Sequence, residues 1–168
     1  HYEFLGLSLE ITRIDPLSRI FGTIFCIAAF MGMVYAAHVK DTIQPFVALI
    51  YIGSAIGAVF AGDMITLFAF WELTAISSVF LIWASRTERA YRAGMRYLII
   101  QVTSGVLLLG GIVLYYQDTG SIAFDYIGLT SLAGGLILVA FGIKSAFPLL
   151  HNWVQDAYPE ATVTGTVI

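Results

Sequence analysis

Residues 64–85 read MITLFAFWELTAISSVFLIWAS, and Glu72 is the one charged side chain in this run. At a rise of about 1.5 Å per residue, a helix over these residues is about 33 Å long, close to the roughly 30 Å of a bilayer's hydrocarbon core. The run therefore predicts a membrane-spanning helix that carries a carboxyl group in its interior.

The composition of the whole chain agrees with this prediction. Of its 168 residues, 59 % are hydrophobic and 11 % are charged, whereas soluble domains have about 45–50 % and about 25 %. These values exclude an ordinary water-soluble domain, and the net charge of only −3 also excludes a disordered chain. The single Cys26 cannot form an internal disulfide. Eight basic residues give no nucleic-acid-binding surface.

Similar apolar windows recur along the chain, and each predicts a transmembrane helix. The predicted spans are residues 16–37, 42–62, 64–85, 97–117 and 129–154, and a sixth begins near residue 161. Residues 1–15 precede them, and the alternation of apolar and polar residues over 7–14 predicts a strand or hairpin on the membrane surface. The expected fold is an all-α membrane protein, a multi-span transmembrane helix bundle that forms part of a larger subunit.

The basic residues distinguish the two sides of this bundle. The connections on one side hold more of them than those on the other: Lys40, Arg86, Arg89, Arg92 and Arg96 against Arg13 and Arg19. By the positive-inside rule the first side faces the cytoplasm, so residues 1–15 are expected to lie outside. Aspartates in the outer connections are expected to be solvated loop charges: Asp63, Asp118 and Asp125.

Glu72 and Lys144 lie inside predicted spans, where a charge costs at least about 2.5–3.5 kcal/mol on insertion scales and marks a functional candidate. Desolvation favours the neutral form of each group and mutual attraction favours the charged forms, so both are candidate proton-exchanging sites. At a separation of about 4–7 Å and an effective dielectric constant of about 20, that attraction is about 2–4 kcal/mol. The alternative is a static pair that fixes the packing of two helices.

Pro148 predicts a break in the last complete span. It has no N–H for the carbonyl of Lys144, four residues earlier, so the helix is expected to be interrupted between these residues. Irregular backbone at membrane depth is tolerated where it is buried in protein or lines a hydrated cavity, and it is typical of transporter sites. His151 is predicted to relay protons between Lys144 and the cytoplasmic face, or else to cap the broken helix.

Further polar residues inside the spans are expected to bond between helices or to their own backbone, or to hydrate a pathway. They are Thr74, Ser77, Ser78, Gln101, Thr103 and Ser104.

Two stretches resemble a known family. They are FWEL at 70–73 and KSAFPLLHNW at 144–153, with DA following at 156–157. Both resemble the antiporter-like membrane subunits of respiratory complex I, membrane-bound hydrogenases and Mrp-type sodium/proton antiporters. The stretch DAYPEA at 156–161 is most similar to the D-type component of Mrp antiporters. The resemblance implies that the chain covers the third to the start of the eighth transmembrane helix of such a protein.

The resemblance also implies roles for particular residues. Glu72, Lys144 and His151 would act in proton translocation, and Pro148 would break the helix. The implied function is that of an ion-transporting subunit, and not of an enzyme, in a multisubunit monovalent cation (Na+)/proton antiporter. No cofactor is expected. The expected partners are other membrane subunits, the lipid bilayer, protons and Na+, and the expected location is the bacterial inner (plasma) membrane.

Three alternatives remain at this point. The nearest is a proton-pumping membrane subunit of an NADH:quinone oxidoreductase (complex I) or a membrane-bound hydrogenase, which would use the same residues. The second is a purely structural anchor protein. The third is a membrane cytochrome with His38 and His151 as axial haem ligands, although both lie near predicted cytoplasmic helix ends and the sequence has no other haem signature.

Overall fold

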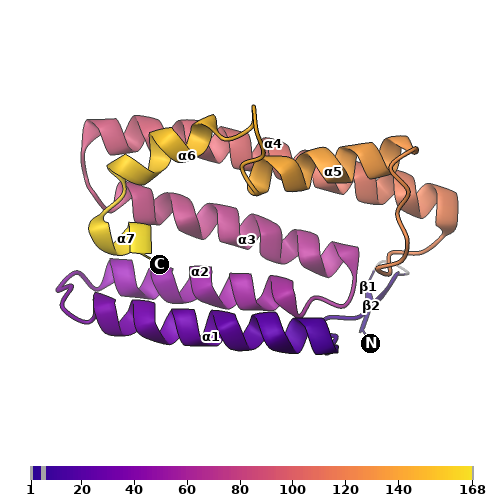
Figure 1. Cartoon of the computed structure of the whole chain (residues 1–168), viewed down its shortest axis with the longest axis horizontal. Coiled ribbons are helices and arrows are strands. Elements are labelled where there is room, and N and C mark those ends of the chain that lie inside the picture. The colour runs from indigo at the N-terminus through magenta and orange to yellow at the C-terminus, as the bar shows by residue number, and fades with distance from the viewer. Residues whose placement is uncertain (1, 5–6, 168) are drawn as a thin grey trace.

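The computed structural model describes residues 2–4 and 7–167 as a helical bundle preceded by a short hairpin. Its elements are β1 (Tyr2–Phe4), β2 (Leu7–Leu9), α1 (Pro16–Ala36), α2 (Ile43–Val59), α3 (Met64–Trp83), α4 (Glu88–Thr119), α5 (Leu132–Lys144), α6 (Asn152–Ala157), the 3₁₀ turn η1 (Tyr158–Glu160) and α7 (Val163–Val167). Helix α3 lies between α2 and α4, and α5 and α6 pack on α4 (Figure 1). The expected helix bundle, with its interruption after Lys144, is confirmed.

Local sequence signals explain where the helices begin and end. The Asp15 carboxylate accepts the backbone N–H of Ser18 at 2.7 Å and starts α1, with Pro16 at its first position. The Thr87 hydroxyl accepts a backbone N–H at the start of α4. Gly120 ends α4 in the left-handed conformation, with φ 69°, which glycine adopts without steric cost.

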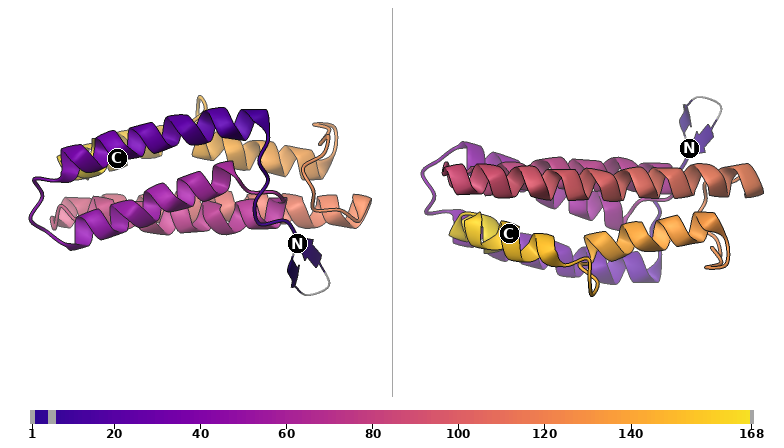
Figure 2. Two further views of the ribbon diagram at one scale, coloured as in Figure 1. Left: turned by 90° about the horizontal axis from the view of Figure 1, so that it is seen from below. Right: turned by 90° about the horizontal axis from the view of Figure 1, so that it is seen from above.

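The hairpin and two inter-helix connections meet at one end of the bundle, from which the hairpin projects (Figure 2). Asp63, the N-cap of α3, joins them there. Its carboxylate accepts the backbone N–H groups of Thr66 and Glu10, both at 2.7 Å, and the next residue, Met64, donates its N–H to Ile122 at 3.0 Å. Asp63 is only 2 % exposed, so the expectation of a solvated loop charge was wrong. Its carboxylate serves as a buried cap because it is fully hydrogen-bonded.

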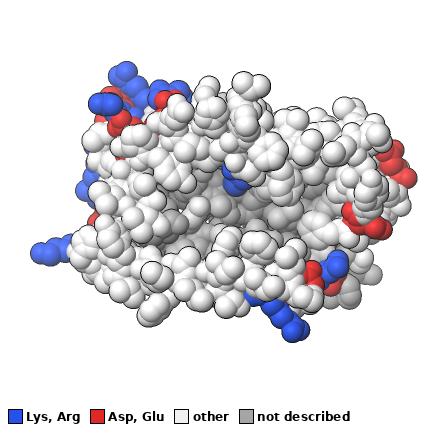
Figure 3. All heavy atoms as spheres, in the orientation of Figure 1, with Lys and Arg blue, Asp and Glu red and all other residues white. Residues whose placement is uncertain are grey.

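Helices α1, α3 and α4 are each long and apolar enough to cross a membrane, and α2 and α5 are shorter apolar helices. The charged side chains gather toward the two ends of the molecule, and a wide uncharged band separates them (Figure 3). A basic group also lies within that band, beside a hollow. This distribution is the one expected of a bundle whose middle faces lipid or other apolar surfaces.

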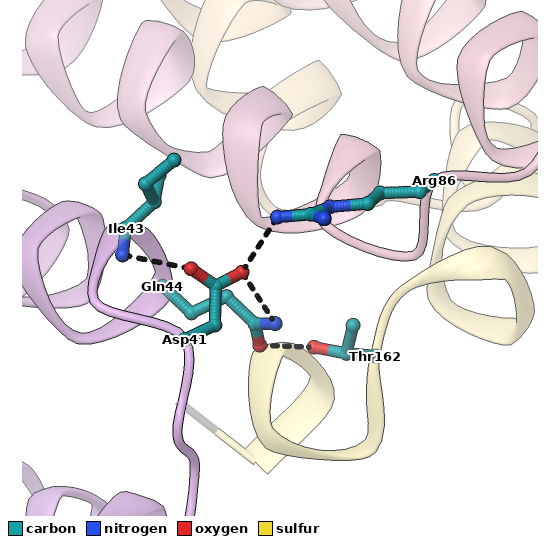
Figure 4. Close-up of polar contacts among 5 residues, drawn as sticks. All are labelled: Asp41, Ile43, Gln44, Arg86 and Thr162. Carbon is teal, nitrogen blue, oxygen red and sulfur yellow. Dashed lines mark hydrogen bonds and ion pairs between the residues drawn. The ribbon is translucent and has the colours of Figure 1, made fainter.

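The α1–α2 loop, the α3–α4 turn and the start of α7 meet at the opposite end, called here the arginine-rich end (Figure 4). Arg86 pairs with Asp41 at 3.3 Å, and Thr162 donates to the Gln44 side chain at 3.2 Å. The backbone N–H of Ile43 donates to Asp41 at 3.0 Å and holds the pKa of that carboxyl below its ordinary value. Polar contacts thus fasten three segments at this end.

Several helices and strands begin or end at other residues than the sequence predicts. Helix α4 starts at Glu88, nine residues before the predicted span, because Thr87 caps it and a helix can continue beyond the hydrocarbon layer into water. The last complete span divides into α5 and α6, which begin and end at other residues than 129 and 154. Strand β2 pairs with β1, whereas residues 10–14 form no strand and bond instead to the α2–α3 connection.

Candidate functional site

Lys144 is the last residue of α5, at the point where the helix is interrupted. Its ammonium nitrogen lies 5.0 Å from the centre of the Trp71 ring and 3.5 Å from the Trp71 carbonyl oxygen. The partial negative charge of a helix C-terminus and the face of an indole ring both favour a cation. These contacts explain how a half-buried lysine is accommodated in the middle of the bundle.

The break after Lys144 is an irregular turn in which two residues other than glycine adopt the left-handed conformation. They are Ala146, with φ 53°, and Leu149, with φ 75°. Pro148 lies between them and has no N–H to offer the helix. Such backbone costs about 1–3 kcal/mol per residue and persists where its surroundings enforce it, often at functional sites.

Trp153, the second residue of α6, connects the two sides of the break. Its indole N–H donates to the Ile143 carbonyl at 2.9 Å, and its ring packs edge-on against Tyr97 of α4 at 5.4 Å. The sequence does not reveal this contact, because the partner of the indole is set by the path of the intervening turn. His151 precedes α6 as its N-cap residue and makes no side-chain capping bond.

Glu72 projects from α3 toward α4. One of its carboxylate oxygens occupies the place that a Cβ atom on Gly105 would take, so this carboxylate fits only against glycine. The same oxygen is buried and has no hydrogen-bond partner among the described residues. Glu72 forms no ion pair with Lys144 there, but the lysine contacts Trp71, the residue immediately before Glu72.

A hydrogen-bond network fixes Trp71, which contacts Lys144 and precedes Glu72 in the chain. The indole N–H donates to the Ser104 hydroxyl of α4 at 3.1 Å, and that hydroxyl donates to the Ala140 carbonyl of α5 at 3.4 Å. Trp71 and Ser104 are both buried, and the Trp71 ring packs against Phe141 of α5 at 4.9 Å. Three helices therefore hold the indole that contacts Lys144.

Lys144 opens onto a cavity of about 510 Å³ that reaches toward the arginine-rich end. Helices α2, α3, α4, α6 and α7 contribute to its wall. The lining includes the polar residues Tyr51, Thr74, Ser78, Tyr97, Gln101, Lys144, Tyr158 and Thr166. A cavity of this size and polarity has room for several water molecules, each of which needs about 30 Å³.

Most polar residues that the sequence analysis singled out in the spans are hydrogen-bonded within the protein. Thr74 donates to Ser54 of α2 at 2.9 Å, and Ser78 bonds the Tyr97 hydroxyl of α4 at 2.7 Å. Ser77 and Thr103 bond carbonyls of their own helices, and Ser104 belongs to the Trp71 network. Gln101 differs, because neither polar atom of its buried amide has a partner in the described part of the chain.

Two ion pairs join the segment after the break to α4 at the arginine-rich end. Arg96 pairs with Asp156 of α6 at 3.0 Å, and Arg89 pairs with Glu160 of η1 at 2.9 Å. The arginines are exposed, so each pair contributes at most about 1 kcal/mol. Because both carboxylates come from the chain beyond Pro148, the pairs still help to position α6 and η1 against α4.

Comparisons with known proteins agree with this arrangement. Residues 61–168 match the family model described as NADH:quinone oxidoreductase/Mrp antiporter, transmembrane. The chain is 31 % identical over 143 residues to the A-type component of the Na(+)/H(+) antiporter of Bacillus subtilis (strain 168), covering 76 % of this chain and 18 % of that protein. It is 27 % identical over 190 residues to NADH-quinone oxidoreductase subunit M of Pseudomonas aeruginosa, covering 98 % of this chain and 36 % of that protein.

A solved structure shares the fold. The Mrp complex from Dietzia sp. DQ12-45-1b contains a chain that superimposes with a TM-score of 0.82 at 22 % identity, covering 92 % of this chain and 32 % of that one. The chain thus spans much less than half the length of these relatives. The expected family is confirmed, and the particular similarity to the D-type Mrp component stays a prediction. The chain belongs to the NADH:quinone oxidoreductase/Mrp antiporter transmembrane family, as an integral membrane protein.

Proposed function

We propose that this chain is an ion-translocating part of a multisubunit monovalent cation (Na+)/proton antiporter in the bacterial inner membrane. Glu72 and Lys144 are its titrating groups, Pro148 keeps the backbone beside Lys144 irregular, and His151 exchanges protons toward the cytoplasmic face. Its partners are the other membrane subunits of that complex. The similarity to a component of the Bacillus subtilis Na(+)/H(+) antiporter supports the choice of an antiporter.

The meeting of a lysine, a helix break and a polar cavity is the observation that carries this proposal. Lys144 ends α5, borders the cavity of about 510 Å³ and contacts Trp71, the neighbour of Glu72. Irregular backbone inside a membrane protein is tolerated where it is covered by protein or lines a hydrated space. Lys144 can therefore exchange protons with water in the cavity and respond to the charge of the buried Glu72 carboxylate.

The proposed mechanism uses attraction between the two charges. The ammonium of Lys144 is favoured by the Glu72 carboxylate, the Trp71 ring and the end of α5. A cation or proton that neutralises Glu72 removes one of these attractions and promotes release of the lysine proton into the cavity. When Glu72 regains its charge, Lys144 takes up a proton again.

A second candidate function has support of its own. The similarity to NADH-quinone oxidoreductase subunit M extends over 98 % of this chain. In that case the same groups would move protons in response to electron transfer in other subunits. Sodium-driven proton movement in vesicles free of quinone substrates supports the antiporter, and co-purification with quinone-reducing subunits supports the second candidate.

Proton flux in vesicles that carry the assembled complex tests the proposal. Glu72→Gln and Lys144→Ala should each reduce ion-driven proton flux to near background without preventing assembly. The double variant should lose little more than either single variant, since residues that act as a unit are not additive. Glu88→Gln is the matched control, because Glu88 lies at the exposed start of α4. Wild-type flux in the assembled Glu72→Gln complex would show that this glutamate is structural.

A further inference from the structure

Among the uncharged polar residues that the sequence analysis singled out in the spans, Gln101 is the one whose side chain has no partner in the described part of the chain. It lies in the middle of α4, its exposure is 0 %, and both its amide nitrogen and its amide oxygen are buried and unbonded among the described residues. Buried polar groups are nearly always hydrogen-bonded, to protein or to ordered water, because leaving them unsatisfied is costly. The amide therefore requires a partner other than the described residues.

The position of Gln101 relates it to both charged groups of the site. Gly105 lies one helical turn further along α4, and a carboxylate oxygen of Glu72 occupies the Cβ position of that glycine. Cβ positions four residues apart on a helix are about 5–6 Å apart. A single small molecule can therefore bridge the Gln101 amide and this Glu72 oxygen. This oxygen is also buried and unbonded. Gln101 also lines the cavity onto which Lys144 opens.

A water molecule has the donors and acceptors that these groups require. A carboxamide offers two donors and an acceptor, and it does not titrate, so it can hold a neutral molecule in place without carrying a proton itself. Buried waters make about three hydrogen bonds to polar groups that lack other partners. The cavity is also large enough to supply further waters.

We propose that Gln101 binds a water molecule that links the Glu72 carboxyl group to the cavity at Lys144. The role of this water in proton transfer rests on the proposed function. In that transfer, the Glu72 O–H bond breaks as the water accepts the proton, while one of the water's own protons passes to the unprotonated Lys144 amine or to the next water. Gln101 stays neutral throughout and is a positioning residue.

The test compares two substitutions of Gln101 in the whole assembled complex. Gln101→Leu keeps a similar size and removes the hydrogen bonds, whereas Gln101→Asn keeps the amide and leaves room for a second water. Thr103→Val is the matched control on the same helix, since that hydroxyl is exposed and bonds its own backbone at 2.7 Å. Assembly, ion-driven proton flux and the infrared absorption of the Glu72 carboxyl group, assigned by its loss in Glu72→Gln, are measured for each variant.

Gln101→Leu should reduce proton flux about tenfold or more, since it leaves the Glu72 carboxyl group without its buried hydrogen-bond partner. The same substitution should shift the Glu72 infrared band. Gln101→Asn should retain most of the flux and the wild-type band, as should Thr103→Val. A merely structural glutamine without partners predicts the opposite for Gln101→Leu, namely unchanged flux and equal or greater stability.

The infrared measurement separates failure of this proposal from failure of the proposed function. If Glu72→Gln leaves flux unchanged, the proposed function fails, and the band shift alone decides whether Gln101 and Glu72 share a water. An unshifted band in Gln101→Leu overturns the water site in either case. If Glu72→Gln abolishes flux but the assembled Gln101→Leu complex transports like the wild type, the positioning role is overturned.

Discussion

Replacement of Gly105 by alanine directly tests whether the position of the Glu72 carboxylate against α4 matters for transport. A Cβ atom at this position would coincide with a carboxylate oxygen of Glu72, so the side chain of Glu72 has to move before Gly105→Ala can pack. Gly105 is buried on the face of α4 that packs against α3. The substitution therefore displaces the carboxylate and leaves its chemistry unchanged.

The magnitude follows from two opposing effects on stability and one on transport. Alanine gains about 1 kcal/mol over glycine in a helix interior, and overpacking of a filled interior costs about 1–3 kcal/mol. The net change in stability is therefore about 0–2 kcal/mol, too small to prevent assembly. Displacement of a reacting group by about 1 Å can cost about 100-fold in rate, so we expect proton flux to fall by about tenfold to 100-fold.

Proton flux in vesicles, normalised to assembled complex, is the assay. Gly110→Ala is the matched control on the same helix, because its new methyl group would meet Leu136 at an ordinary 3.9 Å. Adding Glu72→Asp to Gly105→Ala shortens the acidic side chain and should recover any lost stability without restoring full flux. Assembled Gly105→Ala with flux within about twofold of the wild type would refute the reasoning, since a displacement of this kind changes rates by much more.

Pro148→Ala restores a backbone N–H at the break, so we expect lower proton flux with normal membrane insertion; undiminished flux would show that the proline is dispensable. Because the N–H of Ile43 holds the pKa of Asp41 below its ordinary 3.8, that carboxylate stabilises the protein above about pH 4 and ceases to do so as the pH falls through its lowered pKa. The difference in Tm between wild type and Asp41→Ala should therefore persist at neutral pH and vanish in strong acid, and a difference that grows in acid would contradict this. Single cysteines at Glu88 and Thr119, in a chain without its native cysteine, should react with an impermeant thiol reagent from opposite sides of oriented vesicles; labelling of both from one side is incompatible with the predicted topology.

The helix bundle and the location of its charged centre could be predicted because their physical causes are local in sequence. Apolar windows of sufficient length require helices in a membrane. Lys144 and Glu72 could be identified as candidate functional residues because a charge within a span is costly. Pro148 removes a particular hydrogen bond, so the interruption follows from one residue.

The rest of the site depends on how separate helices meet, which no local pattern records. Gly105 matters because Glu72 faces it, and glycine is too common in membrane helices for its presence to indicate this. Gln101 resembles any other polar residue in a span until its neighbours on α3 and α5 are known. Trp153 bonds Ile143 only because the chain between them turns through two left-handed residues, a path that propensities do not predict.

The length of α4 has a mechanical consequence for the helix break. Residues 88–96 lie outside the apolar part of α4 and extend about 13 Å along its axis. Arg89 and Arg96 on this overhang hold the chain that follows Pro148. The chain beyond the break is therefore attached to a part of α4 that extends past its apolar residues. In water of physiological ionic strength, salt screens charges over about 8 Å. A rise in ionic strength on that side should therefore weaken these two ion pairs and the attachment of α6 and η1 to α4.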